Sequence, residues 1–541
     1  MVIINDMKFT YKIIAFFVLM TIISGCSSGA KIRGIAEREI NRPQLPLRPR
    51  IDPHAWNFFV NGTIFESMGE IYMAKDQYGR ALEAEPSSNE IRYSYANMLS
   101  KLKEFRKSIN EAEPIHPKDV DVWLLIGNNY RTLAIYDSSL ISYHNALKID
   151  SNIVSIYYFM GAFYQQNNNL DSSIWAYKHV ARLAPDYNSF QQLANMQLKA
   201  GKIKDAEASF YQSLALDSTL NNIRSYLALS AIYEEGGDKD KAIEMTESAR
   251  RLDPDDLMIQ NRLLRFYEEN GKLDKGIETS QKIIILDPEN ETIRRRLGIL
   301  YYRADSLKLA DSLFRSIIDS GDSNLVNYYY AGQVAFAQNN YESSKSNFRW
   351  LTSEADTILD GWMNLARVYY AQDSIDEAIN VYETGIGRMR NINDSMIILY
   401  SMAAANEARD SVDLAIEQFE LVIKNQPNNS MAYNYLGYMM ADRGMRLDYS
   451  HQLILKALEL EPENGAYIDS YGWVLYRMGE FKKSVQVLLQ ALKYNDNDPV
   501  IYEHVGDAYN ALGNFKKARE FWGKAYKMNP ENESVIGKLY Q

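Results

Sequence analysis

The chain has 541 residues but only one cysteine, Cys26, and only six histidines. A single cysteine cannot form an intrachain disulfide, a multi-cysteine zinc site or a cysteine-ligated cluster. The histidines are scattered, and none has the His-Glu-x-x-His spacing that places two imidazoles on one helical face. The P-loop, the G-x-G-x-x-G pattern after a strand and the G-x-S-x-G turn of hydrolases are also missing. The sequence therefore predicts a protein that is not an enzyme and that binds neither a metal nor a cofactor.

Basic charge is scarce as well, because 59 Lys and Arg stand against 70 Asp and Glu, with a net charge of −11. Most nucleic-acid affinity comes from basic surfaces, so nucleic acid is not an expected partner. With 46% hydrophobic and 24% charged residues, the composition is that of a globular protein. The length exceeds one ordinary core at roughly 100–200 residues per domain, so we expect several domains or a repeat array.

An apolar run over residues 13–23 follows Lys8 and Lys12 near the start of the chain. A helix of that length is too short to cross a bilayer core of about 30 Å. Basic residues before a short apolar run are typical of a secretion signal. We therefore predict a signal peptide over residues 1–25, with translation starting at Met1 or at Met7.

The predicted signal ends at Ile23-Ser24-Gly25-Cys26. This pattern resembles the bacterial lipobox, and the resemblance implies cleavage before Cys26 and attachment of diacylglycerol to its sulfur. The alternative is a free thiol at an ordinary signal-peptide boundary. Ser27 stands where many lipoproteins of the Gram-negative inner membrane have aspartate, and no acidic run of the surface-export type follows. The resemblance thus implies a lipid-anchored outer-membrane protein on the periplasmic face, with the cell surface as the alternative.

Residues 26–54, which begin at the predicted acylated cysteine, are rich in arginine and proline. Prolines favour a semi-rigid extended spacer, so we interpret this segment as a tether. Its basic charges would suit anionic headgroups or the acidic face of a partner, and a merely solvated linker is the alternative.

From residue 55 a pattern with a period of about 34 residues repeats along the chain. Small residues occupy positions 8 and 20, aromatics positions 11 and 24, alanine position 27 and proline position 32. In the first and last copies these residues are Gly62, Phe65, Ala74, Tyr78, Ala81 and Pro86, and Gly506, Tyr509, Ala518, Trp522, Ala525 and Pro530. The pattern resembles the tetratricopeptide repeat. The resemblance implies an all-α superhelical solenoid with about fourteen helix–turn–helix repeats over residues 55–532.

The small residues at positions 8 and 20 are expected where the two helices of a repeat approach most closely, because bulk there would separate them. The period is disturbed at residues 319–323 and 385–395. We therefore predict three segments of one solenoid and a short tail, at residues 55–320, 325–390, 396–532 and 533–541.

The resemblance also implies a concave groove lined by the first helix of each repeat, near positions 2, 5, 9 and 12. Projected onto this chain, the groove has aromatic residues beside carboxylates, which suits a protein partner because Trp and Tyr are enriched in interface hot spots. The alternative is that several of these residues merely pack between neighbouring helices. The candidates are Met363, Tyr370, Asn434, Tyr438, Asp469, Trp473, Tyr476, Glu503 and Asp507. The basic clamp that grips chaperone C-termini in related grooves is absent, since Leu124, Asn128 and Ser155 occupy its positions.

Residues 433–522 carry a closer resemblance, through Tyr433-Asn-Tyr-Leu-Gly-Tyr438, Ala466-Tyr-Ile-Asp-Ser-Tyr-Gly-Trp473 and Glu503-His-Val-Gly-Asp507. They resemble the C-terminal block of Gram-negative tetratricopeptide outer-membrane lipoproteins, one of which is an adaptor for a periplasmic carboxyl-terminal processing protease. The resemblance implies a non-catalytic scaffold or adaptor that binds periplasmic or envelope proteins and presents substrates to a protease or a cell-wall enzyme. The alternative is a structural subunit of a secretion or outer-membrane assembly machine.

A further motif, Asp followed by Ser or Thr and an apolar residue, recurs six times. These triplets resemble periplasmic O-glycosylation sites of some Gram-negative phyla. The alternative is that Asp and Ser are simply favoured as turn and helix-cap residues. The triplets begin at Asp305, Asp311, Asp356, Asp373, Asp394 and Asp410.

Overall fold

The computed structural model describes residues 52–217 and 219–540. The predicted signal peptide, Cys26 and all but the last residues of the predicted tether lie outside the described residues. In the described residues the chain forms α-helices and one short 3₁₀-helix, η1 (Leu220–Asn222), and no strand. The all-α fold predicted from the sequence is confirmed.

The helices follow one another along the chain as α2 (Pro53–Ser67), α3 (Ile71–Ala84), α4 (Asn89–Lys101), α5 (Phe105–Ala112), α6 (Val120–Thr132), α7 (Tyr136–Ile149), α8 (Val154–Gln166), α9 (Leu170–Leu183), α10 (Tyr187–Lys199), α11 (Ile203–Leu216), α12 (Ile223–Glu235), α13 (Lys239–Leu252), α14 (Leu257–Glu269), α15 (Leu273–Leu286), α16 (Glu291–Arg303), α17 (Leu307–Asp319), α18 (Leu325–Ala337), α19 (Tyr341–Glu354), α20 (Leu359–Tyr370), α21 (Ile375–Ile386), α22 (Ile392–Ala408), α23 (Val412–Asn425), α24 (Ser430–Asp442), α25 (Leu447–Leu460), α26 (Gly465–Arg477), α27 (Phe481–Tyr494), α28 (Pro499–Ala511), α29 (Phe515–Met528) and α30 (Glu533–Tyr540).

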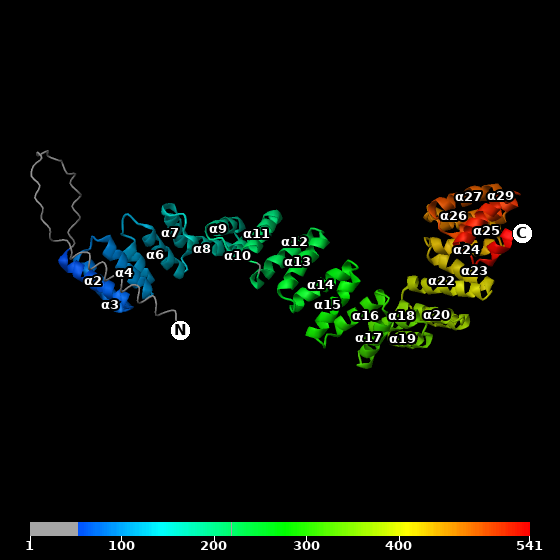
Figure 1. Cartoon of the computed structure of the whole chain (residues 1–541), viewed down its shortest axis with the longest axis horizontal. Coiled ribbons are helices and arrows are strands. Elements are labelled where there is room, and N and C mark those ends of the chain that lie inside the picture. Colours follow the sequence, from blue (N-terminus) through cyan, green and yellow to red (C-terminus); the bar gives the residue numbers. More distant parts are fainter. Residues whose placement is uncertain (1–51, 218, 541) are drawn as a thin grey trace, which may run out of the picture. The chain divides into compact units, whose positions relative to one another are not determined.

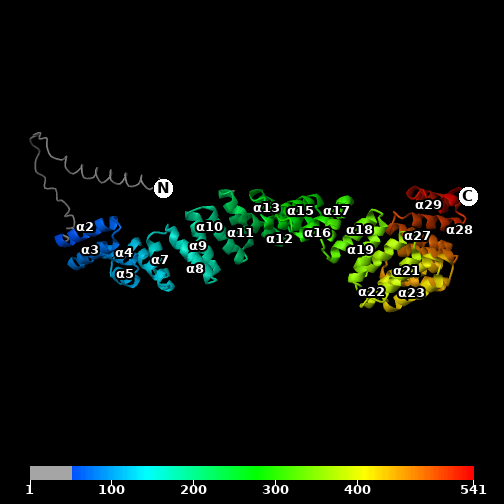
Figure 2. The same ribbon diagram turned by 90° about the horizontal axis from the view of Figure 1, so that it is seen from below.

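Taken in order, the described helices α2 to α29 make fourteen pairs, and α30 follows the last pair. We call each pair a hairpin and its members helix A and helix B. The chain divides into two compact units, one up to Met160 and one from Gly161 onward. Within the second unit, each hairpin from α10 and α11 onward packs against the next in chain order, as Figures 1 and 2 show. The number of hairpins agrees with the period in the sequence.

The period is disturbed where two loops join successive hairpins. One loop lies between the end of α17 at Asp319 and the start of α18 at Leu325, and the other between α21 and α22. Helix α22 is also longer than its neighbours, with 17 residues, so the repeat pattern is displaced there. The segment boundaries near residues 320 and 390 stay predictions.

Glycine at position 8 of helix A allows an aromatic ring of helix B to lie directly on the helix backbone. A Cβ added to Gly506 would lie 2.3 Å from Cδ1 of Trp522, and one added to Gly332 would lie 2.6 Å from Cζ of Phe348. The same contact joins Gly62 to Tyr78. Real Cβ atoms do not approach other carbons so closely, so these rings occupy the space that a side chain would need.

Position 20 of helix B is a small residue, which is alanine or serine in most hairpins and Gly276 in α15. In several hairpins it is a fully buried alanine, as at Ala74 and Ala518. In others it is a buried serine whose hydroxyl donates a hydrogen bond to the carbonyl at position 8, as from Ser484 to Gly472 at 2.7 Å. The serine therefore meets the requirement for a small residue without leaving a buried hydroxyl unpaired.

Replacing Gly506 by alanine should destabilise the last hairpin by about 1–3 kcal/mol, because the new Cβ overlaps the Trp522 ring. The matched control is Gly523→Ala in the adjacent helix α29, where a Cβ meets nothing within 4 Å. This control should stabilise the helix by up to about 1 kcal/mol. Hydrogen exchange in α28 and α29 measures both effects, and equal protection in the two variants would contradict the packing argument.

Candidate protein-binding site

Seven of the nine predicted groove residues come from three consecutive A helices of the second unit, and six of them make the contacts described below. Tyr438 lies on α24, Trp473 on α26 between Asp469 and Tyr476, and Glu503 and Asp507 on α28. Helix α26 packs against both α24 and α28. These positions therefore lie on adjoining helices, in one region that we call the C-terminal surface, and their role in binding stays a prediction.

The other three predicted residues differ in their surroundings. Asn434 also lies on α24, and its side-chain oxygen is buried with no hydrogen-bond partner. Met363 and Tyr370 lie on α20, two hairpins earlier. Met363 packs against the apolar cluster around Trp362, while Tyr370 is 45% exposed. Met363 is thus partly committed to the core, whereas Tyr370 is available to a partner.

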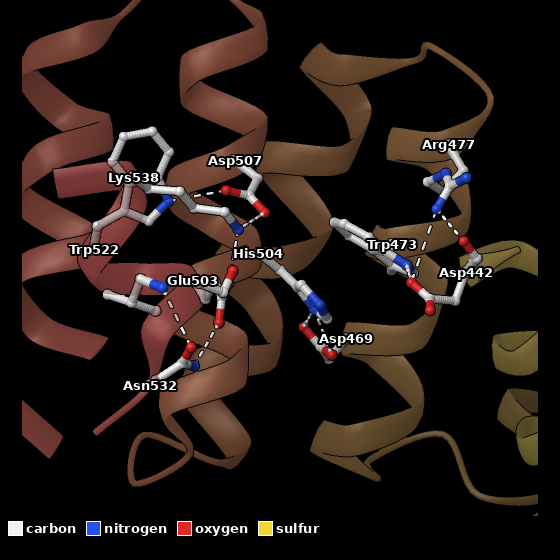
Figure 3. Close-up of polar contacts among 12 residues, drawn as sticks. Asp442, Asp469, Trp473, Arg477, Glu503, His504, Asp507, Trp522, Asn532 and Lys538 are labelled. Carbon is white, nitrogen blue, oxygen red and sulfur yellow. Dashed lines mark hydrogen bonds and ion pairs between the residues drawn. The ribbon is translucent and has the colours of Figure 1, made fainter. Parts of the chain in front are cut away.

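The deepest polar contact of the C-terminal surface joins Asp469 to His504, a residue that the sequence reasoning missed (Figure 3). Nδ1 of His504 lies 3.0 Å from each carboxylate oxygen, and both side chains are buried. Burial disfavours the charged imidazole and so lowers the pKa of His504. The negative charge of Asp469, together with that of Asp507 and Glu503, outweighs this effect, so the pKa of His504 is raised above its usual value. Asp469 and His504 are about one repeat apart in the sequence. This spacing was the available sign that the two side chains lie on adjoining A helices.

His504 also supports Trp473. The two rings are stacked, with centroids 4.2 Å apart and planes 18° from parallel. Tyr476 stacks on the same indole at 4.8 Å, and the indole N–H donates to Oδ1 of Asp442 at 3.2 Å. Arg477 donates to the carbonyl of Asp442 and places its guanidinium 5.9 Å from the indole (Figure 3). Trp473 is therefore held in one orientation by residues of three helices, although it stays partly exposed.

Glu503 and Asp507 are occupied by the last helix. Nζ of Lys538, on α30, lies 2.7 Å from Oε1 of Glu503 and 2.7 Å from Oδ2 of Asp507 (Figure 3). Asp507 also accepts a hydrogen bond of 2.9 Å from the Trp522 indole, and Glu503 accepts one of 3.0 Å from Asn532. These two carboxylates thus hold α30, which forms from the predicted tail, against α28. Most of their hydrogen-bonding capacity is used within the chain, and only part of it is left for a partner.

Tyr438 lies in electronegative surroundings. Burial raises the pKa of its hydroxyl to about 12, and the carboxylates of Asp442, Asp469, Glu503 and Asp498 add to the effect. Its ring is partly buried, with the His504 ring centroid 6.4 Å away. A partner group that approaches Tyr438 therefore meets an aromatic surface with excess negative charge, which favours hydrogen-bond donors and cations.

Over residues 52–217 and 219–540, no cluster of three or more His, Cys, Asp or Glu side chains has the arrangement of a metal site. Among the same residues, no helix combines the length and the apolar character needed to cross a membrane.

Comparison with known proteins agrees with this architecture. Two models described as tetratricopeptide repeat match residues 330–537 and 223–256. The chain contains tetratricopeptide repeats. The TPR repeat-containing protein PA4667 of Pseudomonas aeruginosa strain PAO1 is 34% identical over 100 residues, which are 18% of this chain and 17% of that protein. The chain thus matches about a sixth of that relative's length.

Among solved structures, the chain is similar to the Cut9–Hcn1 hetero-tetramer of APC/C, with 15% identity, 90% of this chain and 96% of the other covered, and a TM-score of 0.36. It is also similar to yeast Tom70, with 13% identity, 72% and 94% covered, and a TM-score of 0.37. Arrays of tetratricopeptide repeats present extended surfaces to other proteins.

The raised pKa of His504 predicts a pH-dependent stability. The charged imidazole stabilises the fold fully below its ordinary pKa of about 6.5, and the contribution is lost as the pH rises through the raised pKa. Asp469→Asn should therefore cost about 3–5 kcal/mol at pH 6 and less at high pH. Urea unfolding over a series of pH values measures the difference, with exposed Asp496→Asn as the control. A cost that does not change with pH would show that the pair is not charged.

Proposed function

We propose that the chain is a non-catalytic adaptor of the cell envelope that binds other proteins through its C-terminal surface. The observation that carries this proposal is the fixed orientation of Trp473, which two stacked rings and a hydrogen bond hold while part of the indole stays exposed. A rigid, partly exposed aromatic residue loses little conformational freedom on binding, which favours a role as an interface hot spot.

The surroundings of Trp473 define the chemistry of the partner. Tyr476 adds aromatic area on the next turn of α26 and Tyr438 adds it on α24, while the carboxylates near Tyr438 add negative charge. Lys538 and Arg477 neutralise part of that charge from within the chain. A partner segment with apolar side chains and one or two cations fits this surface better than an acidic one.

The envelope location rests on the leader and on Cys26, and the resemblance of residues 433–522 to outer-membrane lipoproteins supports it. In this location the adaptor would bring a soluble envelope protein, such as a protease or a cell-wall enzyme, to its substrates. The chain itself supplies the lipid anchor and the binding surface.

Binding should depend on the two tyrosines beside Trp473. Tyr438→Ala with Tyr476→Ala should weaken partner binding by about 2 kcal/mol or more, roughly thirtyfold, because each removes a hot-spot ring. Tyr494 and Tyr526, which are 49% and 39% exposed on B helices, provide the matched double-alanine control. The measurement is a cross-linked pull-down from envelope extract, followed by titration of the purified partner.

The result distinguishes the adaptor from its alternative. Enrichment of one protease or hydrolase that is lost in the Tyr438/Tyr476 variant and kept in the control supports the adaptor. Stoichiometric recovery of integral barrel or secretion subunits would favour a structural subunit instead, and equal capture by both variants would exclude the C-terminal surface.

Cys26→Ser tests the location separately. Without a thiol for acylation the chain should leave the membrane fraction and appear in the soluble periplasm, since two or three acyl chains are needed for stable attachment. Detergent-phase partitioning of the wild type and the variant measures this, and an unchanged membrane fraction would contradict the lipid anchor.

A further inference from the structure

All fourteen hairpin turns of the described chain share one backbone feature, although the turn between α24 and α25 has a second positive φ at Arg446. In each turn, a residue between helix A and helix B has a positive φ. The N–H of the residue that follows it donates a hydrogen bond to a carbonyl in the last turn of helix A. Glycine takes the positive-φ position in half of the turns, because it alone adopts that conformation without strain. Other residues at this position are therefore informative.

Aspartate takes the positive-φ position in three turns, with φ between 54° and 63° at Asp305, Asp373 and Asp410. Serine follows in all three cases, and an aliphatic residue then begins helix B. In the other eleven turns the next residue is never serine. Aspartate and serine thus occur at this place only as a pair, in hairpins α16–α17, α20–α21 and α22–α23.

Helix capping does not explain the serines. The serines at these N-cap positions, Ser306, Ser374 and Ser411, form no side-chain cap hydrogen bond. At the same position in other hairpins, Asn169 and Asn340 do accept a bond from the backbone of helix B. The three hydroxyls are partly exposed, and over residues 52–217 and 219–540 they have no hydrogen-bond partner.

The remaining three triplets lie in other surroundings, although their sequence is equivalent. Ser312 is exposed within helix α17, and Ser395 is buried in the first turn of α22 and donates to the carbonyl of Asn391. Thr357 lies in a loop between hairpins, without a preceding positive φ. The structure therefore separates six equivalent motifs into two groups of three.

The turn at Ser306 also has room for a bulky substituent. A surface hollow of about 750 Å³ is lined by Asp305, Ser306 and Leu307 on one side and by Gln338 on the other. A second acidic residue follows closely after Ser374 and Ser411, at Asp376 and Asp413. An added neutral group would fit beside these carboxylates, whereas an added phosphate would be repelled by them.

We propose that Ser306, Ser374 and Ser411 carry O-linked glycans, an inference that rests on the envelope location in the proposed function. In the transfer, serine Oγ attacks the anomeric carbon of a sugar that is activated as a lipid- or nucleotide-linked diphosphate. The new C–O bond forms as the bond to the diphosphate breaks, the diphosphate leaves with the electron pair, and a base of the transferase takes the hydroxyl proton. The preceding aspartate, exposed at the tip of the turn, is the recognition group.

The first test is mass spectrometry of tryptic peptides from the chain purified from its native envelope. We expect saccharide masses on the peptides that contain Ser306, Ser374 and Ser411, and unmodified peptides for Ser312, Thr357 and Ser395. Bare serines at the three turns, phosphate instead of sugar, or equal occupancy of Ser312 would overturn the proposal.

The second test uses the turn at Ser374. Asp373→Asn should reduce glycan occupancy of Ser374 at least tenfold, while the fold persists because Asn339 adopts the same positive φ in the preceding hairpin. Asp376→Asn is the matched control and should leave occupancy unchanged. Equal occupancy in the two variants would exclude Asp373 as the recognition group.

Fractionation keeps this inference separate from the proposed function. If the chain is found in the envelope with bare serines, only the glycan inference fails. If the chain never reaches the envelope, the proposed location fails, and bare serines are then its consequence.

Discussion

The close approach of the two helices in each hairpin is the constraint on which the rest of the structure depends. Rings such as Trp522 and Phe348 lie on the bare backbone of a glycine in helix A, at distances that leave no room for a side chain. This contact fixes the rotation of helix A about its axis. With 3.6 residues per turn, positions 5, 9 and 12 then share another face, so Asp469, Trp473 and Tyr476 are presented together.

Charge pairs between successive hairpins complete that arrangement. Two acidic residues at the C-terminal surface pair with a group two helices further along the chain: Asp469 of α26 meets His504 of α28, and Asp507 of α28 meets Lys538 of α30. Buried pairs of this kind contribute little net stability, because desolvation offsets their attraction. The Asp469–His504 pair joins α26 to α28, and in this arrangement the His504 ring stacks on Trp473.

The sequence was sufficient for the fold but not for the contacts of the site. A period in small and aromatic residues specifies which residues share a helix face, so the hairpins could be predicted, and the binding role of the groove residues stays a prediction. It does not specify which residue of the next repeat each one meets. His504 was missed for that reason, and Asp507 was projected into the groove although it is 8% exposed and bonded to Trp522 and Lys538. The residues of α30 follow the last full repeat, so the period carries no information about their helix.

The short helix α30 packs on the last hairpin, with Val535 in the apolar cluster around Trp522 and Lys538 between two carboxylates. Loss of α30 would leave Glu503 and Asp507 largely buried without a cation. An unpaired buried charge costs more than its ion pair contributes, so the last hairpin depends on the eight residues that follow it.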